Sequence, residues 1–261
     1  MLTERSARVV AAVKLHRQVA RRRAQRFLIE GAHLVEAASS RGLIREVFVT
    51  ESAAQRYAAL LAEQAATVHI VTERAAKALS DTVTPPGVVA VCEKPEPNLD
   101  EVLAGAPRLI AMGVEISEPG NAGTLIRIAD AMGAAAMVFG GYSVDPYNGK
   151  CLRASAGSVF SIPVVVEPDI GAAVGALQGA GWQVLATTVD GELSLDDVEF
   201  GPPTAWLFGA EARGLSPLLA RQADHRVSIP MGGAAQSLNV AAAAAICLYQ
   251  TARAQRTRAD R

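Results

Sequence analysis

The sequence predicts an α/β protein of two domains, a small α/β domain in front and a larger domain with a mostly parallel sheet. Half of the residues are hydrophobic, and most of these are Ala, Val, Leu and Ile, as is usual in α/β proteins. Strand-like and helix-like segments alternate along the second part, which is typical of a parallel sheet with helices on both faces. A Pro-containing linker at 94–98 predicts a boundary between domains 1–97 and 98–261.

The front domain begins with a basic helical segment that leads into the stretch 27–31. Apolar periodicity then predicts a helix from about residue 33 and helices at 53–65 and 73–79. Apolar runs rich in β-branched residues predict strands at 46–50, 67–71 and 87–92.

The second domain alternates more regularly. We expect strands at 109–114, 135–139, 164–166, 183–187, 205–208 and 226–229, and helices at 122–132, 150–156, 170–179, 217–222 and 238–252. Parallel sheets bind ligands beyond the carboxyl ends of their strands, so functional residues are expected in the loops that follow these strands.

Charge is distributed unevenly although the net charge is only −1. Residues 1–30 hold eight basic side chains against two acidic ones, and further arginines lie near the C-terminus, at positions 253, 256, 258 and 261. The positive charge of the front segment is densest at Arg17, Arg21, Arg22, Arg23 and Arg26. Such a cluster is either a solvated helix face or an RNA-binding surface, and Arg22 and Arg26 would share one helix face.

Cysteine usage and hydropathy predict a cytoplasmic protein without a membrane span. The three cysteines are odd in number and far apart, so neither a disulfide framework nor a zinc site is expected. No apolar stretch follows the basic start as in a signal peptide, and the longest apolar run, residues 240–249, is too short to cross a bilayer.

The first candidate loop, residues 115–121, contains a Pro-Gly turn and then Asn121, which we expect to be the N-cap of the next helix. Leu125 begins the apolar face of that helix, and Arg127 falls on the opposite face. Arg127 is therefore either a surface residue paired with Asp130 or a residue that faces a ligand.

Two further loops are candidates. In residues 208–216, Glu211 lies between Gly209 and Gly214, so this loop either allows close backbone approach to a ligand or is a plain turn with a solvated carboxylate. Residues 229–239 form a Gly-rich loop before an Ala-rich helix, where Ser237 is expected as the N-cap. Such a helix N-terminus also suits an anionic group.

Several other kinds of site are excluded. The only G-x-G, at 179–181, lacks a third glycine and ends a helix, so a dinucleotide fingerprint is rejected, and no P-loop is present. The four histidines are scattered and no metal site is predicted.

Together, the three loops resemble the three signature motifs of the SpoU/TrmH family of RNA 2′-O-methyltransferases. The matching stretches are PGNAGTLIR at 119–127, LFGAEARGLS at 207–216 and IPMGGAAQSLNVAAA at 229–243, and LRASAGSVF at 152–160 resembles a further family segment. They cover most of residues 107–250. Gln236 departs from the Glu or Ser that is commoner there. The front domain, through FLIEG at 27–31, is similar to the ribosomal-protein-like RNA-binding domain of many members.

The resemblance implies a fold and an activity. It implies a SPOUT domain with a C-terminal trefoil knot, which ordinary connection rules would exclude, and a homodimer. It also implies methylation of a ribose 2′-hydroxyl from S-adenosylmethionine. A separate front domain favours large-subunit ribosomal RNA as the substrate, as in antibiotic-resistance types such as the thiostrepton-resistance enzymes.

The family's site residues can be carried over by position. Backbone near Gly209, Ile229 and Leu238 would hold the cofactor, with Thr187 and Met231 nearby. Arg127 would be the essential arginine, and its polar surroundings would be Asn121, Glu211, Ser237 and Asn239. Arg153 joins the front cluster as a candidate RNA contact.

Three alternatives stay open. The chain could methylate transfer RNA, it could methylate a base instead of a ribose, or it could be a non-catalytic RNA-binding protein of the same fold.

Overall fold

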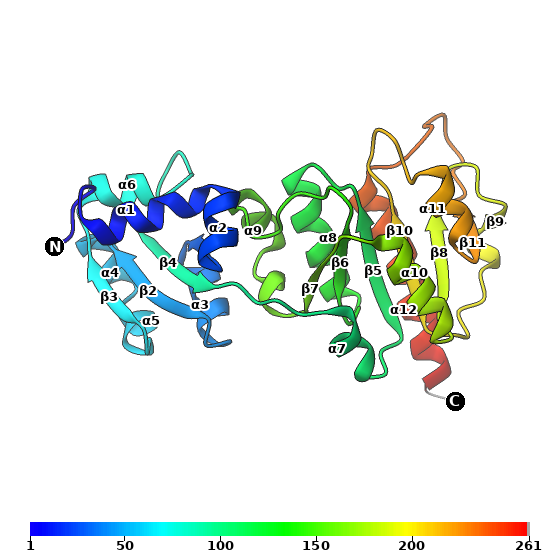
Figure 1. Cartoon of the computed structure of the whole chain (residues 1–261), viewed down its shortest axis with the longest axis horizontal. Helices are drawn as coiled ribbons and strands as arrows, with labels where there is room; N and C mark the ends of the chain where they lie inside the picture. The colour runs from blue at the N-terminus through cyan, green and yellow to red at the C-terminus, as the bar shows by residue number, and fades with distance from the viewer. Residues whose placement is uncertain (260–261) are drawn as a thin grey trace. The chain divides into compact units, whose positions relative to one another are not determined.

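The computed structural model describes residues 1–259, with side-chain environments up to residue 257; Asp260 and Arg261, the latter part of the basic tail, lie outside the described residues. The chain forms two compact units (Figure 1). The front unit consists of residues 1–95 and 145–160, and the parallel-sheet unit of residues 96–144 and 161–261. The segment 145–160 thus packs with the front unit although it follows the predicted boundary in sequence; the boundary at 97 itself stays a prediction.

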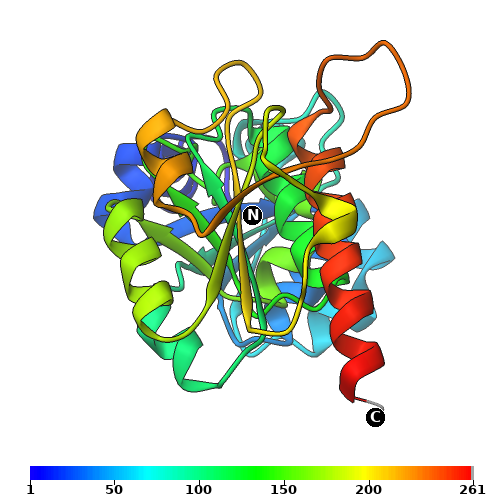
Figure 2. The ribbon, with the colours of Figure 1, turned by 90° about the vertical axis from the view of Figure 1, so that its right-hand side faces the viewer.

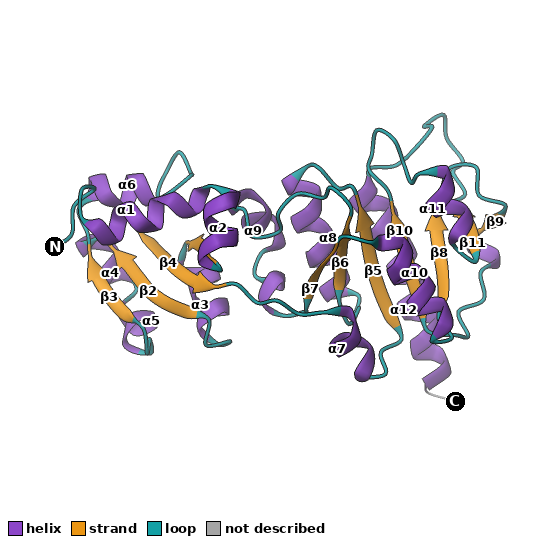
Figure 3. Ribbon diagram, viewed as in Figure 1, coloured by secondary structure: helices purple, strands orange, loops and turns teal. Residues whose placement is uncertain are grey.

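The front unit is built on a four-stranded sheet in the order β1-β4-β2-β3, and Figure 3 distinguishes its strands from the helices around them. The strands are β1 (Arg26–Glu30), β2 (Ile44–Val49), β3 (Thr67–Ile70) and β4 (Val88–Glu93). β4 is antiparallel to both of its neighbours, and β2 is parallel to β3. The helices are α1 (Ala7–Val13), α2 (Gln18–Ala24), α3 (Ala32–Ser39), α4 (Glu51–Arg56), α5 (Ala58–Ala62), α6 (Glu73–Leu79) and α9 (Gly149–Ser155).

Apolar residues from both faces of this sheet hold the unit together. α1 and α6 pack on one face through a cluster that includes Val9, Leu79 and Phe48. α3 and α9 contact β1, and Phe27 stacks on Phe160 at 6.3 Å between ring centroids. Burial of these side chains drives the association of residues 145–160 with a sheet more than fifty residues earlier in the chain.

The second unit contains one wholly parallel sheet of seven strands in the order β7-β6-β5-β10-β8-β11-β9. The strands are β5 (Leu109–Val114), β6 (Met137–Gly140), β7 (Val164–Glu167), β8 (Gln183–Thr187), β9 (Leu193–Ser194), β10 (Thr204–Phe208) and β11 (His225–Ser228). The helices are α7 (Leu99–Ala104), α8 (Pro119–Ala131), α10 (Ile170–Gly179), α11 (Pro217–Gln222) and α12 (Val240–Ala259).

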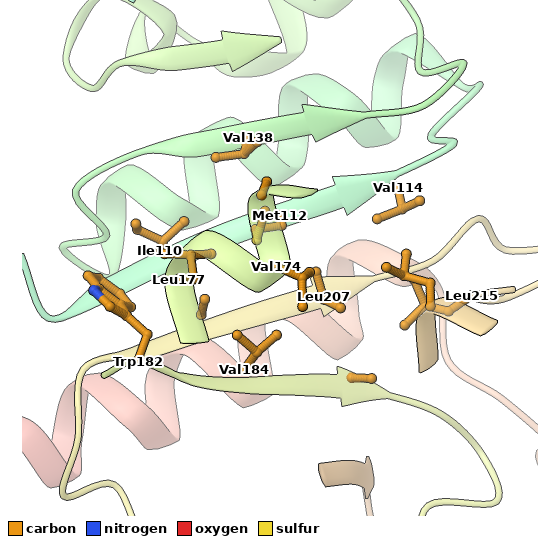
Figure 4. Packing of buried hydrophobic residues seen from close by; sticks show 14 of the residues in the cluster. Ile110, Met112, Val114, Val138, Val174, Leu177, Trp182, Val184, Leu207 and Leu215 are labelled. Atoms are coloured by element: carbon orange, nitrogen blue, oxygen red, sulfur yellow. The ribbon is translucent and has the colours of Figure 1, made fainter. Parts of the chain in front are cut away.

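Helices cover both faces of this sheet, as the alternation predicts. On one face α7, α10 and α11 enclose a core that includes Met112, Val174 and Leu207 (Figure 4). On the other face lie α8 and α12, and the buried Trp206 on β10 donates a hydrogen bond of 2.9 Å from Nε1 to Thr251 Oγ1 on α12. The loop between β11 and α12, in orange, stands out from the unit in Figure 2.

The parallel sheet confirms the predicted fold class, while several local predictions need correction. The helix predicted at 53–65 is two short helices, α4 and α5. The edge strand β9 and helix α7 were not predicted, and residues 26–30 form a full strand. Because α2 ends at Ala24, Arg22 and Arg26 do not share a helix face. The knotted path that the resemblance implies stays a prediction.

No helix among residues 1–259 is both long and apolar enough to cross a bilayer. All three cysteines are buried thiols. Burial raises the pKa of each, to about 12 for Cys151, where the charge of Asp145 adds to the effect.

Candidate active site

The strand order changes direction where β10 lies between β5 and β8, and the loops after these strands and after β11 meet at the carboxyl edge of the sheet. A cavity of about 730 Å³ opens among the loops that follow β8, β10 and β11. All five residues that the sequence singled out for the cofactor line it: Thr187, Gly209, Ile229, Met231 and Leu238. The structure therefore brings together residues spread over more than fifty positions.

The cavity has the mixed character that a nucleoside with a charged tail requires. Leu215, Ile229 and Leu238 offer apolar surface, and Asp190 lies on its wall. Thr188 also lines it, and its buried Oγ1 has no hydrogen-bond partner within residues 1–259. Buried polar atoms are normally paired, so Thr188 Oγ1 is available to a bound ligand. These residues fit S-adenosylmethionine in size and chemistry.

Thr188 is a site residue that the sequence argument missed. Thr187, which was predicted, donates its hydroxyl to Leu207 O at 2.9 Å and so ties the end of β8 to β10. A signal was present, because the two threonines stand together at the carboxyl end of a predicted strand.

Gly209 allows a close approach between two stretches of backbone. A Cβ at this position would lie 2.3 Å from Gly214 C and 2.4 Å from Leu215 N. The glycine is therefore required by the loop 210–214 that folds back over it, and the close approach is between two stretches of this chain's own backbone. The same loop supplies Glu211 and Arg213 to the cavity wall.

Asn239 joins the three candidate loops. Its Nδ2 donates to Asn121 Oδ1 at 3.3 Å and also to Glu211 Oε1. Its Oδ1 accepts from Ala241 N at 2.9 Å, which caps α12. Three of the predicted catalytic residues thus form one hydrogen-bonded cluster, which we call the Asn239 cluster (Asn121, Glu211 and Asn239).

The two predicted helix caps were wrong. Asn239, not Ser237, caps α12, and Ser237 lies in the loop before it, exposed and on the wall of the cavity. α8 begins at Pro119, and Glu118 accepts from Gly120 N at 3.3 Å as its N-cap. Asn121 lies inside the first turn of α8, so its side chain is free to bond Asn239 instead of its own helix.

Arg127 is exposed on α8, away from the core, as predicted. Within residues 1–259 it makes no ion pair with Asp130, so the simple surface pair is not formed. It does not line the cavity. The structure therefore does not join Arg127 to the Asn239 cluster in a single chain.

The basic front cluster divides into exposed and buried members. Arg17, Arg22, Arg23 and Arg26 are exposed. Arg21 is 5% exposed, and its guanidinium bonds Asp145 at 2.6 Å and the carbonyls of Leu15 and His16 at 2.9 Å. The prediction that Arg21 contacts RNA is therefore wrong, because its charge is used inside the front unit.

Arg153 is also engaged within the front unit. Its Nη1 bonds Glu30 at 2.9 Å and also Asp81, and Ser80 donates to the same Glu30 carboxylate at 2.5 Å. The side chain of Arg153 is still 35% exposed, so its assignment as an RNA contact stays a prediction. The ion pairs of Arg21 and Arg153 anchor residues 145–160. In the described part of the chain, no group of His, Cys, Asp or Glu is arranged to hold a metal ion.

A second hollow of about 500 Å³ adjoins the cavity. The two share Ala210, Glu211, Arg213 and Val240, and the second is also lined by residues of the loops after β5 and β6. Within the Asn239 cluster, Glu211 lies on the walls of both spaces and Asn121 on the wall of the second. A ligand in the first and a substrate in the second would meet at the wall that Glu211 shares.

Comparison with known proteins agrees with this geometry. A model of the SpoU rRNA Methylase family matches residues 108–249, and one of the MRM3-like substrate binding domain matches residues 7–90. The 23S rRNA (guanosine(2553)-2′-O)-methyltransferase RlmP of Bacillus subtilis is 37% identical over 237 residues, covering 90% of this chain and 92% of that protein. The 23S rRNA (uridine(2479)-2′-O)-methyltransferase of Streptomyces viridochromogenes is 40% identical over 174 residues, 65% of this chain and 61% of that protein.

Solved structures extend the likeness to nearly the whole chain. The SpoU methyltransferase AviRb from Streptomyces viridochromogenes, in complex with the cofactor AdoMet, has a TM-score of 0.88 at 32% identity and covers 97% of this chain and 99% of its own. An AdoMet-bound rRNA methyltransferase from Sinorhizobium meliloti has a TM-score of 0.83 at 29% identity, covering 95% of each chain. With a family model that spans more than half of its length, this chain belongs to the SpoU rRNA methylase family.

Proposed function

We propose that this protein transfers a methyl group from S-adenosylmethionine to a ribose 2′-hydroxyl of 23S ribosomal RNA. The observation that carries the proposal is the Asn239 cluster, whose Glu211 lies on the wall shared by a cavity of cofactor size and a second hollow. The relatives named as 23S rRNA methyltransferases, and the AdoMet complexes of AviRb and the Sinorhizobium enzyme, support it.

The cofactor cavity has the features needed to bind and orient the donor. S-adenosylmethionine, when bound, supplies an electrophilic methyl group on its sulfonium sulfur. Apolar walls at Ile229 and Leu238, with the unpaired hydroxyl of Thr188, would hold the donor in one orientation. Placing donor and acceptor side by side supplies much of the rate of such a transfer.

Arg127 is assigned to the RNA and not to proton transfer. Guanidinium does not lose its proton in proteins, so Arg127 is unsuited to act as a base. An exposed, unpaired arginine binds phosphate well and stabilises negative charge that develops on the attacking 2′-oxygen.

We also propose a homodimer, because Arg127 lines neither space in one chain. In a dimer, Arg127 of one chain would complete the site of its partner. Mixing Arg127→Ala with Asn239→Ala, each inactive alone, should restore part of the activity through mixed dimers. No recovery from mixed dimers of confirmed composition would assign Arg127 to the site of its own chain. The expected cytoplasmic location remains a prediction.

The direct test is methyl transfer to an unmodified 23S rRNA transcript, followed by nuclease digestion and mass spectrometry of the nucleosides. We expect a 2′-O-methylated nucleoside, and loss of transfer in Arg127→Ala with the affinity for S-adenosylmethionine unchanged within a few-fold. Modification of a base, or of a transfer RNA transcript alone, would contradict the proposal. Binding of S-adenosylmethionine without any transfer would indicate a non-catalytic RNA-binding protein.

A further inference from the structure

The hollow of about 500 Å³ beside the cofactor cavity is formed mainly by loops after β5 and β6 and by the loop after β10. Its volume falls in the range of sites for small ligands and bases. Because it shares part of its wall with the cofactor cavity, a nucleotide bound there keeps its ribose close to the methyl donor.

Hydrogen bonds hold the rim of this hollow in place. Glu115 N donates to Gly140 O at 3.1 Å, and Val144 N donates to Ile116 O at 2.8 Å. The hydroxyl of Ser143 accepts from Ile116 N at 3.1 Å and donates to Gly140 O at 2.7 Å. The loops after the neighbouring strands β5 and β6 are thus joined to each other, so the side chains on them are preorganised.

Tyr142 stands on this rim with 94% of its surface exposed. A single exposed aromatic residue needs no explanation by itself. At the mouth of a hollow beside a methyl-donor cavity, however, the ring offers a flat apolar face to a substrate. Proteins that take a base out of an RNA strand commonly stack it on such a ring.

Glu115 is the carboxylate in this hollow that is free to accept hydrogen bonds. Glu118 caps α8, and Glu211 is bonded to Asn239. Within the described chain the Glu115 carboxylate makes no hydrogen bond or ion pair, and its side chain lies against Gly141, where a Cβ would be 3.2 Å from Glu115 Cγ. Its backbone has φ +55°, a strained conformation for a residue with a Cβ, and such strain is concentrated at functional positions.

The charge of the hollow indicates which part of an RNA it accepts. Within one chain, three carboxylates and one guanidinium, that of Arg213, line it, so its own walls favour a neutral base over a phosphate. Carboxylates only accept hydrogen bonds. Guanine presents two adjacent donors, N1–H and the N2 amino group, whereas uracil presents one N–H between two carbonyl oxygens that a carboxylate repels.

We propose that this hollow binds the target base and selects guanine. The ring of Tyr142 stacks on the base, and the carboxylate of Glu115 accepts hydrogen bonds from N1 and the N2 amino group. This inference rests on the proposed function, and it adds the identity of the nucleoside to be methylated.

The test begins with the nucleoside that the wild-type protein methylates in a 23S rRNA transcript, where we expect 2′-O-methylguanosine. A short RNA around that position is then made with inosine, which lacks the N2 amino group, in place of the target guanosine. We expect kcat/KM to fall by roughly tenfold with inosine, the size expected for one hydrogen bond to a charged group. In Glu115→Gln, kcat/KM with guanosine should fall by roughly 10- to 100-fold, and the inosine penalty should shrink to within about twofold.

Three controls separate base recognition from other effects. Glu199→Gln, an exposed carboxylate of the same unit away from both spaces, should behave as wild type. Tyr142→Ala, which removes the ring, should lower kcat/KM far more than Tyr142→Phe, which keeps it, with S-adenosylmethionine affinity and oligomeric state unchanged in both. The proposal is overturned by methylation of uridine, by an inosine penalty that persists in Glu115→Gln, or by a change of oligomeric state in Tyr142→Ala. If the wild-type protein methylates no RNA, the proposed function itself fails.

Discussion

Replacing Gly209 tests whether the backbone around the cavity is as tightly packed as the structure shows. In Gly209→Ala the new Cβ would lie 2.3 Å from Gly214 C, 2.4 Å from Leu215 N and 2.6 Å from Gly214 O. Ordinary contacts begin at 3.4 Å, so the loop 210–214 has to retreat by about 1 Å. No flexible side chain can absorb this movement, because all three contacts are with backbone.

The displaced loop carries Glu211 and Arg213, which line both spaces, and Glu211 bonds Asn239. Overpacking of this kind costs about 1–3 kcal/mol of the free energy of unfolding. A misplacement of about 1 Å in an active site lowers the catalytic rate by up to roughly 100-fold. We therefore expect the affinity for S-adenosylmethionine to fall by roughly 10- to 100-fold.

Isothermal titration calorimetry measures this affinity, and denaturant unfolding measures the stability. Gly233→Ala is the matched control, because nothing lies within 4 Å of a Cβ there although the residue belongs to another candidate loop. We expect the control to bind as wild type. Wild-type affinity in Gly209→Ala would refute the reasoning, since the loop would then accommodate a Cβ without moving the cavity wall.

Three further predictions concern burial and charge. Arg21→Ala leaves Asp145, whose side chain is 12% exposed, without its partner and should lower the free energy of unfolding by about 2–3 kcal/mol. The exposed Arg22→Ala should change it by less than about 0.5 kcal/mol, and equal effects in denaturant titrations would contradict the Arg21–Asp145 pair. Burial raises the pKa of the Cys151 thiol to about 12, whereas an unfolded thiol ionises near 9.0, so the contribution of this thiol to stability should be lost as pH rises from 9 toward 12. Titration with a thiol reagent should show slow reaction in the native protein and three reactive thiols after unfolding. Rapid reaction of the native protein would show that the thiols are not buried. Changing the exposed Arg22, Arg23 and Arg26 to Gln should flatten the log–log salt dependence of RNA binding by about two to three units and leave cofactor affinity unchanged. The control changes three exposed basic residues of the same unit, Arg41, Arg74 and Lys77, to Gln. An unaltered slope in the first variant would show that the front cluster is a solvated face.

The sequence by itself determined the fold class and the composition of the site. Alternation of strand and helix patterns predicts a parallel sheet because each pattern follows from which face of an element must be buried. Loops that follow parallel strands share one edge, so the loops that contain Gly209 and Leu238 were expected together, and the structure places both residues on one cavity. Local periodicity and the geometry of a parallel sheet predicted that these loops meet, whereas the assignment of Thr187 and the other cofactor residues came from the resemblance to the family.

Only the tertiary structure decided which of several similar residues is buried, which is paired and which lines a cavity. Arg21 and Arg22 are neighbours with the same side chain, but Arg21 is buried because Asp145, 124 residues later, lies against it. Asn239 could be recognised as the link between loops only once Asn121 and Glu211 stood beside it. Glu115 and Tyr142 likewise gain their significance from two strands that become neighbours in the sheet. Burial, pairing and cavity walls depend on contacts between residues that are distant in the sequence. The hydrophobic pattern of the sequence shows which residues must be buried, but it does not show which distant residues will pack against them.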